Sequence, residues 1–147
     1  MKKGLSATLI QHIILFLIGG FIYVCIELGW RGYSHWTMFI LGGLCFVIVG
    51  SLNEYALKKF KLDLPLAPQM IFGGLIITLL EYITGYIVNI KLGWNVWDYS
   101  DRPFNIDGQI CLGATILWIM ISLLIIVIDD YIRYKLFGDE KRKYKMF

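Results

Sequence analysis

The sequence predicts an all-α, polytopic membrane protein in which four transmembrane helices form one bundle. Three properties of its 147 residues lead to this prediction: 58% are hydrophobic, only 17% are charged, and the mean hydropathy is +0.66. A water-soluble domain of this size has too small an interior to bury so much apolar surface. An intrinsically disordered chain is excluded as well, because such chains are poor in hydrophobic residues.

Four apolar stretches come close to the roughly 20 residues that a helix needs to cross the hydrocarbon core. We predict spans at about 5–28, 36–54, 66–90 and 106–128, within a single transmembrane domain over 1–147. Membrane strands are excluded because the apolar runs are long and do not alternate with polar residues. The first stretch is interpreted as an uncleaved span, because it is too long for a signal peptide and no small-residue cleavage site follows it.

The lysines and arginines predict the orientation of the spans. If the N-terminus is cytoplasmic, three of the fourteen flank the outer ends of the spans: Arg31, Lys91 and Arg102. The other eleven then lie on the cytoplasmic side: Lys2, Lys3, Lys58, Lys59, Lys61, Arg133, Lys135, Lys141, Arg142, Lys143 and Lys145. Since basic residues concentrate in cytoplasmic flanks, both the N- and the C-terminus are predicted to be cytoplasmic.

Paired glycines inside three of the spans predict close packing of the helices. The pairs are Gly19-Gly20, Gly42-Gly43 and Gly73-Gly74. Small residues allow the backbones of membrane helices to approach each other. The alternative interpretation is a flexible point in a transporter helix.

The segment after the last span, 133–147, is basic and rich in aromatic residues. It carries six of the basic residues together with Tyr134, Phe137, Tyr144 and Phe147. A segment of this kind is attracted to the anionic inner leaflet of the bilayer, and we predict that contact. Docking of a cytoplasmic partner is the alternative, and nucleic-acid binding is not expected because the chain has no basic folded domain.

Glu81 is the most informative single residue, because it lies about midway along the predicted span 66–90. A charge at the bilayer centre costs at least about 2.5–3.5 kcal/mol on insertion scales. We therefore expect Glu81 to face the interior of the bundle and to have a partner. A proton- or ligand-binding carboxylate is one interpretation, and a structural hydrogen bond between helices is the other.

Acidic residues near the ends of the spans predict local ion pairs. Glu27 precedes Arg31 by four positions, and Glu54 precedes Lys58 by the same interval. This order of acid and base supports a pair on one face of a helix. Two acidic residues that end the last span near the inner surface are assigned no particular partner: Asp129 and Asp130.

The densest polar sequence joins the third and fourth spans on the predicted outer side. We predict an outer vestibule there, lined by Trp97, Asp98, Arg102, Asn105 and Gln109. The alternative is structural: Asp98 would bind turn amides, and Asn105 or Asp107 would cap the last span.

The sequence contains no recognisable motif for catalysis, nucleotide binding or metal binding. It has neither a G-x-x-x-x-G-K-[ST] loop, nor a G-x-S-x-G elbow, nor an H-E-x-x-H pair. We therefore expect no cofactor, no metal ligands and no catalytic residues, which disfavours an enzyme without excluding one. Cys25 and Cys111 are predicted to lie near the same membrane surface. A disulfide between them is therefore one alternative, but free thiols are favoured.

Several short motifs resemble the Putative ABC-transporter type IV (CmpB) family of small bacterial membrane proteins. The resemblance covers about residues 15–125 and rests on Glu27, Arg31-Gly32, Leu80-Glu81-Tyr82-Ile83-Thr84-Gly85, Trp97-Asp98-Tyr99-Ser100, Pro103-Phe104-Asn105, Gly108 and Ile110-Cys111-Leu112. The family usually has a proline-containing segment near the second span, where this chain has Gly32-Tyr33-Ser34-His35-Trp36. The resemblance implies a bacterial cytoplasmic membrane and a role for Glu27, Arg31, Glu81, Trp97, Asp98, Asn105 and Gly108.

Three functions remain open from the sequence. The first is a permease-like transport component that binds a polar solute or ion at the outer vestibule, with Glu81 as the deep carboxylate. The second is a non-catalytic assembly or regulatory subunit, and the third is a membrane enzyme that acts on lipid-linked substrates. Because the chain is short, a transport pathway is expected to need a homo-oligomer, a membrane partner or an ATPase partner.

Overall fold

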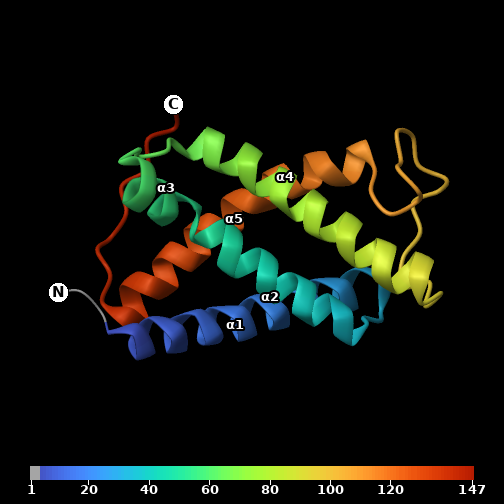
Figure 1. The fold of residues 1–147 in the computed structure, drawn as a ribbon, viewed down its shortest axis with the longest axis horizontal. Helices are drawn as coiled ribbons and strands as arrows, with labels where there is room; N and C mark the ends of the chain where they lie inside the picture. Colours follow the sequence, from blue (N-terminus) through green and yellow to red (C-terminus); the bar gives the residue numbers. More distant parts are fainter. Residues whose placement is uncertain (1–3) are drawn as a thin grey trace.

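The computed structural model describes residues 4–147, so the predicted cytoplasmic residues Lys2 and Lys3 lie outside the described part of the chain. The elements, in chain order, are α1 (Leu5–Arg31), α2 (Trp36–Gly50), α3 (Leu52–Phe60), α4 (Leu66–Gly85), the π-helix η1 (Tyr86–Lys91) and α5 (Leu112–Phe137) (Figure 1). All the named elements are helical, which confirms the predicted all-α class.

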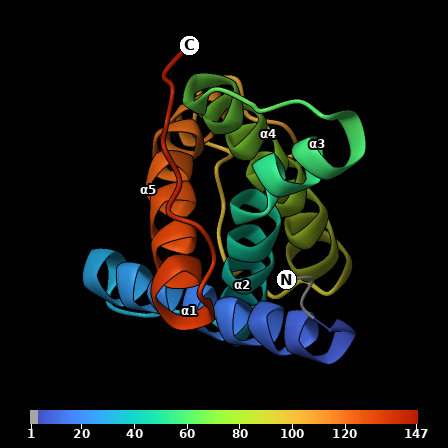
Figure 2. The same cartoon turned by 90° about the vertical axis from the view of Figure 1, so that its left-hand side faces the viewer.

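The four long helices run alternately in opposite directions along the molecule (Figure 1). The α1–α2 turn and the loop 92–111 lie at one end. The start of α1, the short helix α3 and the C-terminal segment lie at the other end, so both ends of the described chain are on the same side of the bundle. In Figure 2, α1 lies across the bundle at a steep angle to α5.

Three of the helices are individually long and apolar enough to cross a membrane: α1, α4 continued by η1, and α5. The fourth candidate is α2 together with α3, which are bent by 42° relative to each other. The chain is therefore a multi-span membrane protein with three to four candidate spans. The stretch predicted at 36–54 is interrupted at Ser51, which lies between the end of α2 at Gly50 and the start of α3 at Leu52.

The last helix begins at Leu112, later than the predicted start near 106. Its N-cap is Cys111, whose Sγ accepts a hydrogen bond from the Ala114 amide at 3.4 Å. The expectation that Asn105 or Asp107 caps this helix is wrong. Residues 106–110 instead form a tight turn, in which the Ile106 amide donates to the Ile110 carbonyl and Gly108 adopts a φ of 67°.

The glycine pairs lie where helices approach each other, as predicted. A Cβ atom on Gly20 would stand 2.7 Å from the Phe39 carbonyl oxygen, and one on Gly43 would stand 2.7 Å from that of Phe16. These contacts join α1 to α2. On α4, a Cβ atom on Gly74 would stand 2.6 Å from the backbone nitrogen of Ile119 on α5. Close backbone approach is thus the basis of both helix pairs.

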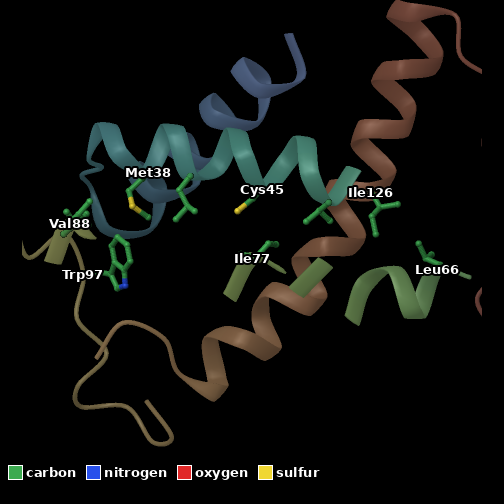
Figure 3. Packing of buried hydrophobic residues seen from close by; sticks show 10 residues of the cluster. Met38, Cys45, Leu66, Ile77, Val88, Trp97 and Ile126 are labelled. Carbon is green, nitrogen blue, oxygen red and sulfur yellow. The ribbon is translucent and has the colours of Figure 1, made fainter. Parts of the chain in front are cut away.

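Helix α2 links the two pairs, because it contacts α4 and α5 as well as α1. The buried hydrophobic cluster follows this helix along the molecule (Figure 3). Val88 and Trp97 close the cluster at the loop end, Cys45 and Ile77 lie in the middle, and Leu66 lies near the opposite end.

The C-terminal segment crosses the bundle end that carries α3. The carbonyl oxygens of Lys145 and Met146 accept hydrogen bonds from the Leu66 and Ala67 amides, at 2.7 and 3.1 Å. These two amides belong to the first turn of α4, which has no helical acceptors for them. The basic tail therefore packs against the bundle, while its predicted contact with an anionic leaflet stays a prediction.

Candidate functional site

The carboxylate of Glu81 lies inside the bundle, as predicted. Glu81 is only 2% exposed to solvent. Trp118 Nε1 on α5 donates a hydrogen bond to Oε2 at 2.7 Å, and the Tyr99 hydroxyl in the loop 92–111 donates to Oε1 at 3.1 Å. Glu81 thus connects α4 to α5 and to the loop through two uncharged donors.

A small cavity of about 50 Å³ borders Glu81 between α1, α2, α4 and α5. Its wall is mostly apolar and includes the rings of Tyr23 and Trp118. Among the described residues that line it, Glu81 alone carries a formal charge. The volume accommodates a few water molecules or a small chemical group.

Glu27 and Arg31 form the predicted ion pair at the loop end of α1, with Arg31 Nη2 at 2.5 Å from Glu27 Oε1. The Ser34 hydroxyl donates to the other carboxylate oxygen at 2.6 Å. Arg31 Nη1 also donates to the Val96 carbonyl at 3.1 Å. This pair therefore fastens the end of α1 to the loop 92–111.

Asn89 on the π-helix binds the start of this loop, a role that was not predicted from the sequence. Its Oδ1 accepts from the Val96 amide at 2.6 Å, and its Nδ2 donates to the Trp97 carbonyl at 3.0 Å and to Gln109 Oε1 at 2.8 Å. Trp97 Nε1 in turn donates to the Gln109 carbonyl at 2.9 Å. The one signal in the sequence was an amide side chain inside an apolar stretch.

The five residues predicted to line the vestibule fall into two groups. Trp97 and Gln109 are buried in the network around Asn89, whereas Asp98, Arg102 and Asn105 lie toward the surface of the loop. Asp98 Oδ1 accepts from the Ser100 amide and hydroxyl, and Asn105 donates to the Arg102 carbonyl. The polar groups of the loop therefore largely bind each other, and solute binding at this end stays a prediction.

A second polar cluster, also missed from the sequence, lies at the opposite end of the bundle. Arg133 on α5 donates to Asp129 Oδ2 at 2.5 Å, to Glu54 Oε2 at 3.2 Å and to the Ser51 hydroxyl at 2.9 Å. Arg133 and Asp129 are 3% and 0% exposed. The predicted Glu54–Lys58 pair is wrong, because the bend after Gly50 brings Glu54 toward Arg133 instead.

The potential metal ligands among residues 4–147 do not form a metal site. No cluster of three or more His, Cys, Asp or Glu side chains suited to a metal occurs in that part of the chain. Cys25 and Cys111 are separate free thiols, Cys25 exposed and Cys111 buried.

A family model described as "Putative ABC-transporter type IV" matches residues 14–146. The chain belongs to this family. The match includes Glu81, the network around Asn89, the loop 92–111 and Arg133. Comparisons with curated proteins and with solved structures find no match.

Replacing Asn89 with leucine is expected to loosen the loop 92–111, which contacts Glu81 through Tyr99. The change removes three hydrogen bonds and leaves the buried Val96 amide and Trp97 carbonyl without their partners. A buried polar group that loses its partner costs about 1–3 kcal/mol, so the loop should open locally. Hydrogen exchange of the 92–111 amides, measured in nanodiscs, should become at least about tenfold faster. Equal exchange in wild type and Asn89→Leu would contradict the assigned role.

Ser100 is expected to control the titration of Asp98. The Ser100 hydroxyl, and then its amide, donate to the carboxylate and hold the pKa of Asp98 below its usual value. A lowered pKa in the folded state stabilises the loop above the ordinary pKa of aspartate, and the benefit is lost as pH falls through the lowered value. Ser100→Ala should raise the pKa of Asp98 toward its usual range in a carbon-13 carboxyl titration. Ser34→Ala, in the other loop at this end, should leave it unchanged.

Proposed function

We propose that the protein is a small permease-like transport component, in which Glu81 binds a polar solute or ion deep in the membrane. The N- and C-termini would be cytoplasmic, in a bacterial cytoplasmic membrane, and the loop 92–111 would face the outside. The observation that supports the proposal is a buried carboxylate that borders a cavity inside the helix bundle.

The free-energy cost of placing Glu81 near the middle of the membrane favours a functional role for this residue. A scaffold of four apolar helices has no need of a mid-membrane carboxylate, since apolar packing and close backbone contact already join the helices. The ion pairs found within residues 4–147 do not include Glu81. Glu81 therefore has no ion-pair partner in the described part of the protein.

Tyr99 gives the proposed site a connection to the outer side. This side chain belongs to the loop 92–111, yet its hydroxyl reaches Glu81. A displacement of the loop would remove one donor from the carboxylate and uncover the site from that end. A complete pathway would then require a second copy, a membrane partner or an ATPase partner, because the cavity beside Glu81 is small.

Infrared difference spectroscopy of the reconstituted protein tests this proposal. The carboxyl band of Glu81 is identified as the band that disappears in Glu81→Gln and persists in Asp130→Asn, which removes a carboxyl at the other end of the bundle. If outside pH changes that band, water reaches Glu81 and transport is supported. If the band does not respond at any pH, the proposal fails.

A non-catalytic assembly subunit is the second candidate, and one observation favours it. Each oxygen of Glu81 already has a donor, and the two donors come from separate elements. In that case Glu81 would act as a structural fastener between α4, α5 and the loop. Glu81→Gln would then lower the unfolding temperature while the infrared band of wild type stays silent.

A further inference from the structure

We propose that the cavity beside Glu81 binds the head group of an amphiphilic alkylammonium ion, which enters sideways from the bilayer between α1 and α5. This inference rests on the proposed function and names the substrate class of the same site. It joins three features of the described residues: one carboxylate without an ion-pair partner, two aromatic rings and an apolar seam between two helices.

The charge of the occupant follows from the partners of Glu81. Both of its hydrogen-bond donors, Trp118 Nε1 and the Tyr99 hydroxyl, are neutral. A buried carboxylate without a counter-ion is costly, so a cation is the occupant that gains most from this position. An ammonium group offers both the charge and additional hydrogen bonds to the carboxylate oxygens.

The rest of the cavity selects an organic cation over a metal ion. Hard metal cations require several oxygen ligands, and Glu81 is the one carboxylate among the described residues of the wall. The Tyr23 and Trp118 rings both line the cavity, with their centroids 6.3 Å apart. Aromatic faces attract organic ammonium groups, and the aliphatic wall around them accepts methylene groups.

The route into the cavity follows from the packing of the helices. Helix α1 packs closely against α2, and α4 packs closely against α5, whereas α1 and α5 form no comparably close pair. Isoleucines from both helices line the cavity: Ile22 and Ile26 on α1, and Ile121 and Ile125 on α5. Ile26 is exposed on the outside of the bundle. The seam therefore offers an apolar path from the acyl chains to the carboxylate.

The size of the cavity determines where the head group and the alkyl chain of the ligand would lie. A volume of about 50 Å³ accommodates an ammonium head group but not a long alkyl chain. The chain would lie along the isoleucines of α1 and α5 and remain among the lipid tails. An amphiphile that is already dissolved in the bilayer satisfies both requirements.

Equilibrium dialysis of radiolabelled octylamine tests the inference, with the protein in phosphatidylcholine nanodiscs and protein-free nanodiscs subtracted. We expect one saturable site at a pH where the amine is protonated. Unlabelled 1-octanol and octanoate, which share the chain length, should compete at least about tenfold more weakly than octylamine. Equal competition by octanol would overturn the inference, because the carboxylate would then contribute nothing.

Two pairs of variants locate the site. Glu81→Gln should weaken binding at least about tenfold, whereas Asp130→Asn should not change it. Ile121→Trp fills the seam without altering Glu81 and should also abolish binding, whereas Ile116→Trp, at an exposed position on the same helix, should leave it intact. Unchanged binding in both Glu81→Gln and Ile121→Trp would refute the site.

The two proposals fail in different ways. If the Glu81 infrared band responds to pH but octylamine shows no charge-dependent binding, a transport role remains and the alkylammonium class is refuted. If octylamine binds as expected but the band is silent to outside pH, the site holds and the outward pathway is refuted.

Discussion

Replacing Arg133 with methionine is expected to lower the free energy of unfolding by about 3–5 kcal/mol. Methionine fills a similar volume but supplies neither the positive charge nor the donors. Asp129 would be left as a fully buried carboxylate without its partner, and Glu54 and Ser51 would lose their link to α5. Unfolding in mixed detergent micelles, followed by circular dichroism, measures the loss.

Two further variants make the Arg133 prediction specific. Lys135→Met removes an exposed positive charge from the same helix and should change the unfolding free energy by less than about 0.5 kcal/mol. Adding Asp129→Asn to Arg133→Met should restore part of the stability, because the buried charge is removed. A loss of less than about 1 kcal/mol in Arg133→Met alone would contradict a buried ion pair.

Gly74→Leu is expected to be the second severe change, with a loss of about 3 kcal/mol. The new Cβ atom would meet the backbone nitrogen and Cα of Ile119 at 2.6 and 2.7 Å. Backbone atoms of a helix cannot rotate away as a side chain does, so α4 and α5 must separate. Separation also weakens the hydrogen bond from Trp118 to Glu81, which should shift the tryptophan emission.

Gly113→Leu is the matched control for Gly74→Leu. Apart from its chain neighbours and the nearby backbone of its own helix, a Cβ atom on Gly113 would have no atom within 4 Å, so a side chain there projects into open space. It should leave the unfolding transition nearly unchanged under the same conditions. Equal stability of the two leucine variants would mean that the α4–α5 contact does not depend on a glycine.

The sequence was sufficient for features that depend on composition or on neighbouring positions. Hydropathy predicted the apolar helices, the four-residue interval predicted the Glu27–Arg31 pair, and the cost of a mid-span acid predicted the interior position of Glu81. The paired glycines indicated helix contacts, because small side chains have that effect wherever they occur in a membrane helix.

Features that depend on distant parts of the chain could not be predicted in this way. Arg133 lies 79 positions from Glu54 and 82 from Ser51, and the bend between α2 and α3 brings them together. The same applies to Trp118, which reaches Glu81 across 37 positions. The start of α5 was misplaced for a local reason, since the turn at Gly108 uses residues that also suit a helix cap.

The position of Glu81 along the chain has a consequence for biosynthesis. Its two hydrogen-bond donors follow it by 18 and 37 positions, so a ribosome completes α4 before either donor exists. The nascent helix must carry this acid at a cost of at least about 2.5–3.5 kcal/mol until α5 arrives. Insertion of α4 and α5 as one hairpin shortens that interval, and the close glycine contact between them favours such joint insertion.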